Sequence, residues 1–239
     1  MGLVGGRRFA GKRNVMADAP GPAVPKGDPI GMTLRERPFY LVGVVKGLKK
    51  EGERVVKLIT EIAPDAIALA VAPEEVGGLR EYTDQEVEMS KIEEAYAKHL
   101  SRWGKVELPP PPYLDALRLA TAKLAPVYGL DFDEETYSTL YVELVTGLRM
   151  IAAGIMEDGL LEQEFKAEDE FGFALEWDRA VNRTKGHKQL ESERENHIAG
   201  EIARFAVKHE RLLAIVEFER LDGICRHLSV AGAGSLAEF

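Results

Sequence analysis

The stretch from Phe39 to Ala72 constrains the fold most strongly, because it contains a strand, a helix and a second strand in close succession. Residues 39–45 form a short apolar run rich in aromatic and β-branched side chains, typical of a buried strand. Apolar residues then recur at helical spacing over 50–62, and Pro64 ends that helix because proline disfavours helical backbone in the preceding residue. Residues 66–72 are again apolar and uncharged, as in a strand covered on both faces. The stretch predicts a βαβ unit.

The rest of the body is predicted to be mainly helical, with one further strand near the C-terminus. Periodicity and proline breaks favour helices over 84–103, 113–124, 133–156, 165–180, 190–208 and 222–228, and a strand over 211–217. We therefore expect an α/β fold whose mixed or parallel β-sheet core is built from both ends of the chain. It should form a single domain over 38–230, with a large helical insertion at about 83–185.

The first 37 residues differ from the rest of the chain in the sign of their net charge. Residues 1–37 carry a net charge of +4, whereas the 239-residue chain as a whole carries −9. This segment is rich in glycine and proline and shows no apolar periodicity, so it is predicted to be a disordered basic arm. Such an arm can contact nucleic acid or an acidic protein, or it can be a simple solvated tail. Residues 231–239 are predicted to be a flexible tail.

Composition excludes several classes of protein. Hydrophobic residues make up 45% and charged residues 30%, which is enough for a sizeable core. The single cysteine, Cys225, excludes an internal disulfide framework and a zinc cluster of cysteines, and its apolar neighbours predict a packed core thiol. No window approaches the roughly 18 uninterrupted apolar residues of a membrane span. Since the N-terminus has no signal-peptide pattern, we expect a cytoplasmic protein.

Four motifs follow one another in a distinctive order. They are Tyr40-Leu-Val-Gly-Val-Val-Lys-Gly, Ala63-Pro-Asp-Ala-Ile-Ala-Leu-Ala-Val, Glu193-Arg-Glu-Asn-His-Ile-Ala and Leu213-Ala-Ile-Val-Glu-Phe-Glu-Arg-Leu-Asp-Gly-Ile. This order resembles the TraB family, which is related to Tiki proteases, ChaN-like proteins and erythromycin esterases. The resemblance covers roughly residues 38–80 and 188–228. It implies an α/β fold and, in typical members, a metal or acid–base site made by two Gly-x-x-His motifs and a strand glutamate.

The chain departs from the family at those chemical positions. Lys46 stands at the first histidine, Ala70 at the strand glutamate and Arg220 at the second histidine. The family's later arginine falls near Glu75, and the second motif glycine is also lost, at Glu217. A protonated lysine or arginine cannot donate a lone pair to a metal. The resemblance therefore implies a catalytically degenerate member, a pseudoenzyme with no catalytic residues and no cofactor.

The replacements leave two interpretations of the site open. In one, cations at the strand ends form a pocket for an anionic small molecule. Its candidate residues are Gly43, Lys46, Arg194, Glu217, Glu219 and Arg220. In the other, the nearby carboxylates of Glu75, Glu217 and Glu219 neutralise Lys46 and Arg220 as internal salt bridges.

A relocated metal site is a further alternative. Glu193, His197 and Glu201 lie four residues apart and would share one face of a helix, where they could bind a divalent ion. Charged helix faces of this kind are also ordinary solvent surface. Tyr137, Tyr141 and Phe173 fall on apolar stripes and are predicted to be core or oligomer contacts.

Three functions follow from these patterns. The first is a TraB-like binding or scaffolding module that forms a homo-oligomer through its helical insertion. The second is a metal-dependent hydrolase or peptidase that uses the relocated ligands. The third is an accessory factor of a nucleoprotein assembly, docked through the basic arm.

Overall fold

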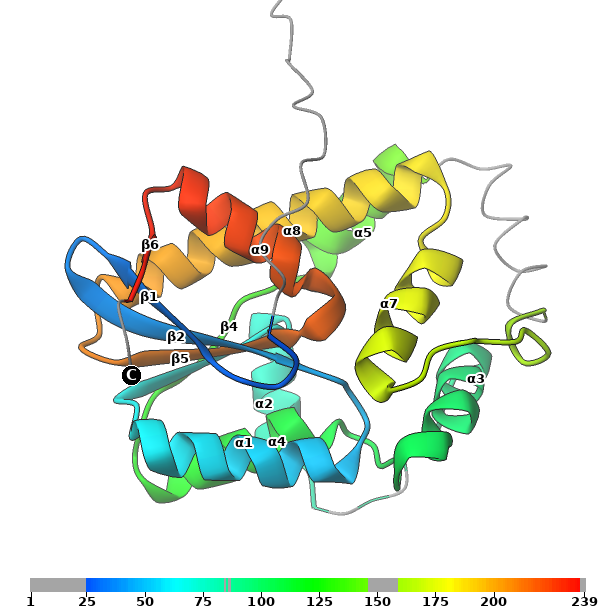
Figure 1. The fold of residues 1–239 in the computed structure, drawn as a ribbon, viewed down its shortest axis with the longest axis horizontal. Coiled ribbons are helices and arrows are strands. Elements are labelled where there is room, and N and C mark those ends of the chain that lie inside the picture. The colour runs from blue at the N-terminus through cyan, green and yellow to red at the C-terminus, as the bar shows by residue number, and fades with distance from the viewer. Residues whose placement is uncertain (1–24, 84, 86, 146–158, 237–239) are drawn as a thin grey trace, which may run out of the picture.

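The computed structural model describes residues 25–83, 85, 87–145 and 159–236, which form a six-stranded sheet with helices on both faces (Figure 1). The strand order is β4-β3-β5-β2-β1-β6. The strands are β1 (Ile30–Leu34), β2 (Arg37–Val44), β3 (Ala66–Leu69), β4 (Val127–Gly129), β5 (Leu212–Glu217) and β6 (Gly234–Ser235). Strands β2, β5, β3 and β4 are parallel, whereas β1 pairs antiparallel with both β2 and β6. Because β2 lies beside β5, the mixed sheet is built from both ends of the chain, as predicted.

The central strands are buried on both faces because successive side chains point to opposite sides of the sheet. In β5, Leu213 and Ile215 belong to one hydrophobic cluster, and Ala214 and Val216 belong to the other. All six residues of β5 are buried. This arrangement explains the uninterrupted apolar runs in the sequence.

The helices form two layers and a group at the end of the sheet (Figure 1). Helices α1 (Lys49–Ile62) and α4 (Pro111–Ala122) cover one face, and α8 (Lys185–Ala206) and α9 (Phe218–Val230) cover the other. Helices α3 (Lys91–Leu100) and α7 (Glu170–Val181) stand beyond the carboxyl ends of the parallel strands. The remaining elements are α2 (Pro73–Glu81), the 3₁₀ turn η1 (Ser101–Trp103) and α5 (Glu134–Leu144).

The predicted boundaries of the basic arm and of the tail were wrong. Residues 30–34 form strand β1 inside the region assigned to the arm, and Met32 and Leu34 are buried in the core. Arg54 donates a hydrogen bond to the carbonyl of Gly27, so the fold begins before residue 38. Residues 234–235, assigned to the tail, pair with β1 as β6. The interpretation failed because two alternating apolar side chains are too weak a strand signal among glycines and prolines. Residues 1–24 of the arm lie outside the described residues.

Several predicted element boundaries also need correction. Helix α3 begins at Lys91 rather than residue 84, because Ser90 and Glu93 form a capping box there. Helix α5 begins at Glu134 with Asp133 as its cap, close to the predicted start at residue 133. Residues 146–158 of the helix predicted over 133–156 lie outside the described residues. Neither α2 nor β4 was predicted. Because β4 pairs with β3, the middle of the chain is not wholly a helical insertion.

No helix among the described residues is long and apolar enough to cross a membrane.

Candidate functional site

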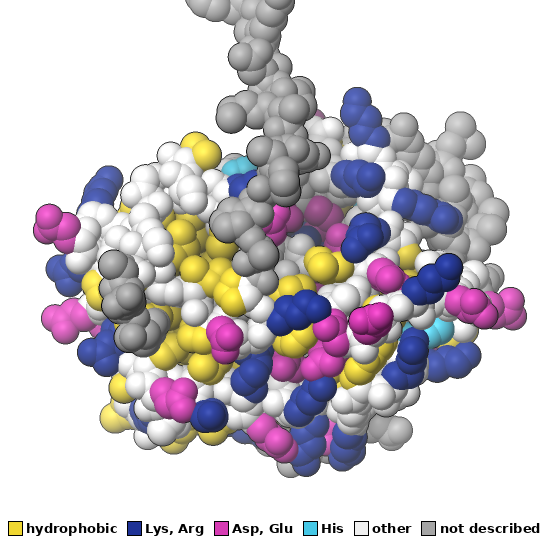
Figure 2. Space-filling view, in the orientation of Figure 1, with side chains coloured by type: hydrophobic (Ala, Val, Ile, Leu, Met, Phe, Trp, Pro, Cys, Tyr) yellow, Lys and Arg dark blue, Asp and Glu magenta, His cyan; other side chains and the backbone are white. Residues whose placement is uncertain are grey.

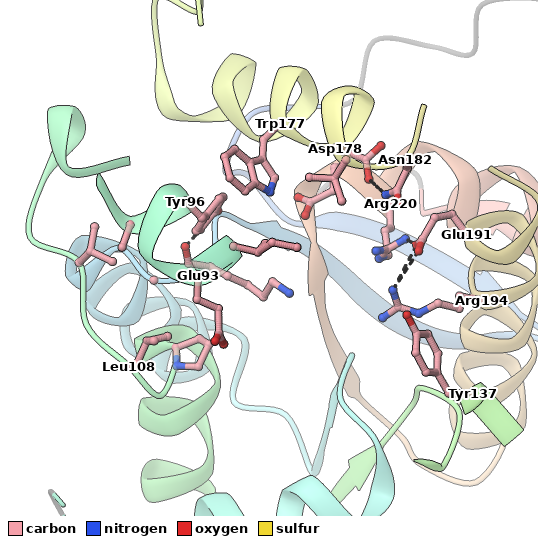
Figure 3. Close-up of a pocket in the computed structure, with 18 residues that line it drawn as sticks. Glu93, Tyr96, Leu108, Tyr137, Trp177, Asp178, Asn182, Glu191, Arg194 and Arg220 are labelled. Atoms are coloured by element: carbon pink, nitrogen blue, oxygen red, sulfur yellow. Dashed lines mark hydrogen bonds and ion pairs between the residues drawn. The ribbon is translucent and has the colours of Figure 1, made fainter. Parts of the chain in front are cut away.

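A pocket of about 320 Å³ lies beyond the carboxyl ends of β2 and β5, between α3, α7, α8 and the start of α9 (Figure 3). Ligands in open α/β sheets bind at this edge, where loops and helix ends converge. One part of the lining is aromatic and aliphatic, and the other consists of charged side chains. Lys46, Arg194, Glu219 and Arg220, all predicted as site residues, line the pocket.

The turn that carries Lys46 is fixed by hydrogen bonds to its backbone. The Val45 N–H donates to the buried carboxylate of Glu51 at 3.0 Å. The Arg54 guanidinium binds the same carboxylate and donates to the carbonyl of Gly43 at 2.8 Å. From the other side, the Tyr96 hydroxyl donates to the carbonyl of Lys46 at 3.2 Å. These contacts hold the backbone around Lys46 in place and so fix the point from which its side chain extends.

The second set of site residues begins a helix directly after β5. The sequence predicted a loop before a helix at 222, but α9 begins at Phe218, the residue after the end of β5. The buried side chains of Phe218, Leu221 and Ile224 continue the helical spacing back to the strand end. Glu219 and Arg220 therefore lie in the first helical turn and not on a loop.

Gly43 in β2 lets the first turn of α9 pack closely against the strand, and it does not line the pocket. A Cβ atom at Gly43 would lie 2.7 Å from the Leu221 side chain and 3.1 Å from Phe218. Its role is to let α9 pack against β2, so its assignment to the pocket was wrong. Glu75 is also elsewhere: its carboxylate accepts the Ala72 N–H at 2.9 Å and caps α2.

The three basic side chains of the pocket are all engaged in ion pairs. The Lys46 ammonium lies 3.1 Å from Glu217, and Arg220 pairs with Glu191 and lies 3.7 Å from Glu217. Glu191 also lies 3.1 Å from Arg194, which in turn pairs with Asp131. Figure 3 shows Arg220, Glu191 and Arg194 in succession along one side of the pocket. The structure thus supports the salt-bridge interpretation for Glu217, which faces both Lys46 and Arg220. Among the described residues, neither Glu75 nor Glu219 forms an ion pair with these cations, and Glu191 pairs with Arg220 in their place.

Burial and these pairs shift the proton affinities of the site. Burial acts to raise the pKa of Asp131, but its hydrogen bonds with Arg194 outweigh this and hold the pKa below its ordinary value. Burial, together with the neighbouring charge of Glu217, raises the pKa of Glu219 to about 8. Burial also raises the pKa of Tyr96, which remains a neutral phenol. The site thus holds an ionised, paired carboxylate beside one that is largely protonated at pH 7.

An aromatic wall faces this charged network. The Tyr96 and Trp177 rings lie 5.2 Å apart in an edge-to-face arrangement (Figure 3). On the far side, Arg194 lies 5.7 Å from the centre of the Tyr137 ring. Phe173 is fully buried, as predicted, whereas Tyr137 borders the pocket. No sequence pattern identifies Tyr96, Trp177, Glu191 and Asp131 as site residues, because only the tertiary fold brings their elements to the strand ends.

The alternative metal site on α8 is not assembled. His197 stacks on the Phe132 ring at 4.3 Å, and Glu201 is bound by Arg204. Both line a second, more open hollow beside β4, whose other residues include Arg80 and Asp131. Within the described ranges, no group of three histidine, cysteine, aspartate or glutamate side chains lies close enough to hold a metal. Helical spacing alone could not reveal that the His197 ring stacks on an aromatic side chain and that the Glu201 carboxylate is paired with an arginine.

No protein-family model matches this chain, and no curated protein matches it at a significant level.

Proposed function

We propose that the chain is a TraB-like binding module that holds a small organic molecule in the pocket at the carboxyl edge of its sheet. The observation that carries this proposal is that Lys46 and Arg220, which the resemblance places at the family's histidine positions, are both engaged in ion pairs. Both are committed to Glu217 and to the ion pairs around it. A preformed pocket with an aromatic wall remains beside them.

The same residues argue against the hydrolase alternative. Neither cation can donate a lone pair to a metal or act as a general base at neutral pH. Ala70, at the position of the family's glutamate, is a buried methyl group. The volume of the pocket, about 320 Å³, lies at the lower end of the range of small-molecule sites, roughly 300–1,000 Å³.

A fragment screen by ligand-observed NMR tests the proposal. The set should contain small aromatic fragments of positive, negative and zero charge. We expect some to bind the wild type and to lose binding in Val181→Trp, which fills the pocket from α7. Leu124→Trp, at a site that is 92% exposed, is the matched control and should bind as the wild type does. If no fragment binds, or if Val181→Trp binds them equally well, the proposal is wrong.

Elemental analysis of the purified protein tests the hydrolase alternative separately. The binding-module proposal predicts no stoichiometric metal, and one bound metal per chain would contradict it. Self-association through the middle helices stays a prediction, which light scattering can test.

The nucleoprotein alternative depends on a basic arm, most of which lies outside the described residues. On the face shown in Figure 2, lysine and arginine side chains are interspersed with aspartate and glutamate. That face of the described body therefore presents no broad basic surface of the kind that binds nucleic acid.

A further inference from the structure

We infer that the ligand of this pocket is an organic cation, held between the Glu219 carboxylate and the Tyr96–Trp177 wall. The inference rests on the proposed function, since it concerns the same pocket. It reverses the charge that the sequence predicted for the ligand. The reason is that the basic side chains of the pocket are already paired with carboxylates.

Each basic side chain of the pocket already has a carboxylate partner. Lys46, Arg194 and Arg220 are matched by Glu217, Asp131 and Glu191 in one connected network. An anionic ligand would compete with these carboxylates for the same cations, and displacing Glu217, which is 2% exposed, would leave a buried carboxylate without a partner.

The acidic groups are in excess. In addition to the paired carboxylate of Glu191, the acidic side chains of Glu93, Asp178 and Glu219 line the pocket. Glu93 accepts hydrogen bonds from the neutral Ser90, and Asp178 accepts one from the neutral Asn182 at 2.8 Å, while the charge of Arg220 also acts on Asp178. Among the described side chains, none forms an ion pair with Glu219. A bound cation would be paired by Glu219 once this carboxyl group gives up its proton.

The Tyr96–Trp177 wall suits the same class of ligand. Tyr96 and Trp177 present two aromatic rings to the pocket. Aromatic faces attract ammonium groups through their quadrupole, most strongly where water is excluded. Aliphatic side chains of Ile92, Val106 and Val181 border the rings and can contact an apolar body.

The inference predicts that ligand binding is coupled to release of a proton. The groups that act on Glu219 are Glu217 and Asp178, which disfavour its ionisation, and Lys46, which favours it. Tyr96 and Tyr113 also face it, and both phenols stay neutral because burial raises the pKa of each. The adjoining Arg220 is committed to its carboxylates. Since a cation stabilises the ionised carboxylate, binding should release the proton that Glu219 carries below pH 8.

The test uses three probes that share a benzyl group and differ in charge. They are benzyltrimethylammonium, whose charge does not titrate, benzyl methyl ether and phenylacetate. By calorimetry or NMR at pH 8, we expect the ammonium probe to bind at least tenfold more tightly than the other two. Its affinity should rise by up to about tenfold per pH unit between pH 6 and 8, and then level off.

Glu219→Gln should weaken binding of the ammonium probe at least tenfold and remove its pH dependence. Glu162→Gln, an exposed carboxylate outside the pocket, is the matched control and should change neither. If Glu219→Gln does not fold, proton release can be measured on the wild type alone, by titrating the probe in two buffers of different ionisation enthalpy.

The outcomes separate the two proposals. Phenylacetate that binds as tightly as the ammonium probe, or binding without proton release, overturns the inference and leaves the binding module intact. If none of the three probes binds while other fragments of the screen do, the inference is again wrong alone. If neither the probes nor the fragments bind, both proposals are wrong.

Discussion

Lys46 and Glu217 form an ion pair of 3.1 Å that joins the ends of the adjacent parallel strands β2 and β5. The Glu217 carboxylate is 2% exposed, and its second oxygen lies 3.7 Å from Nε of Arg220. One buried carboxylate thus faces cations from two separate elements. This arrangement ties the strand ends and the first turn of α9 together.

The buried network predicts a large loss of stability when Arg220 is removed. Arg220→Met leaves Glu191 and Glu217 without this partner, and breaking a buried pair in this way costs roughly 3–5 kcal/mol. Urea unfolding should show this loss as a lower transition midpoint. Arg204→Met removes an ion pair whose arginine is 50% exposed and should cost less than about 1 kcal/mol. Equal losses in the two variants would show that the network adds nothing beyond a surface pair.

Two glycines of the same helix should respond in opposite ways to alanine. At Gly186, a Cβ would lie 2.3 Å from the carbonyl oxygen of Leu144, so Gly186→Ala must push α5 and α8 apart and should cost roughly 1–3 kcal/mol. At Gly200, a Cβ meets no atom within 4 Å. Gly200→Ala should therefore gain about 0.5–1 kcal/mol from helix propensity. Thermal unfolding of both variants measures the difference, and loss of stability in Gly200→Ala would refute the argument.

Glu195 should make stability fall as the pH rises from about 4.5 to about 7. Burial raises the pKa of Glu195 to about 7, helped by Asp178 and Asp222 and opposed by Arg226. The unfolded chain therefore loses this proton at lower pH than the folded chain, and the free energy of unfolding decreases between the two pKa values. Glu195→Gln should match the wild type near pH 4 and exceed its stability at pH 8, by on the order of 2 kcal/mol for a partly exposed group. Unfolding curves at both pH values measure the effect, and a constant difference between the variants would contradict it.

The Cys225 thiol should react slowly in the folded protein. Burial, with a contribution from Asp222, raises the pKa of this thiol to about 11, so little thiolate exists at pH 8. Modification by a disulfide reagent should be at least tenfold slower in the native protein than in urea. Equal rates in the two conditions would show that the thiol is not shielded in the fold.

The sequence predicts the framework better than the site. Runs such as 39–45 and 211–217 identify β2 and β5 because both are buried on two faces and carry an unbroken apolar signal. The short strands at the edges of the sheet, β4 and β6, and the strand beside β6, β1, carry no such signal, which is why they were missed. Lys46 and Arg220 were identified from the family pattern, and the structure brings both to the Glu217 carboxylate.

The partners that decide the chemistry could not be predicted. Glu191 lies on α8, and Asp131 lies between β4 and α5, so neither is close to Arg220 in the chain. Tyr96 and Trp177 stand on α3 and α7, where helical spacing alone describes them as core residues. Their shared location depends on how the helices cross the end of the sheet, and no local pattern encodes that crossing.

The strand order also governs when the protein can fold during its synthesis. Strand β5 lies between β2 and β3, although both of those leave the ribosome long before residues 212–217 are made. Until β5 is made, β2 can pair only with β1, and β3 only with β4, so each of these strands keeps one unpaired edge while residues 130–211 are translated. Such non-local pairing is slow and exposes apolar edges to aggregation. The nascent chain should therefore depend on chaperones that shield β2 and β3 until translation reaches Glu217.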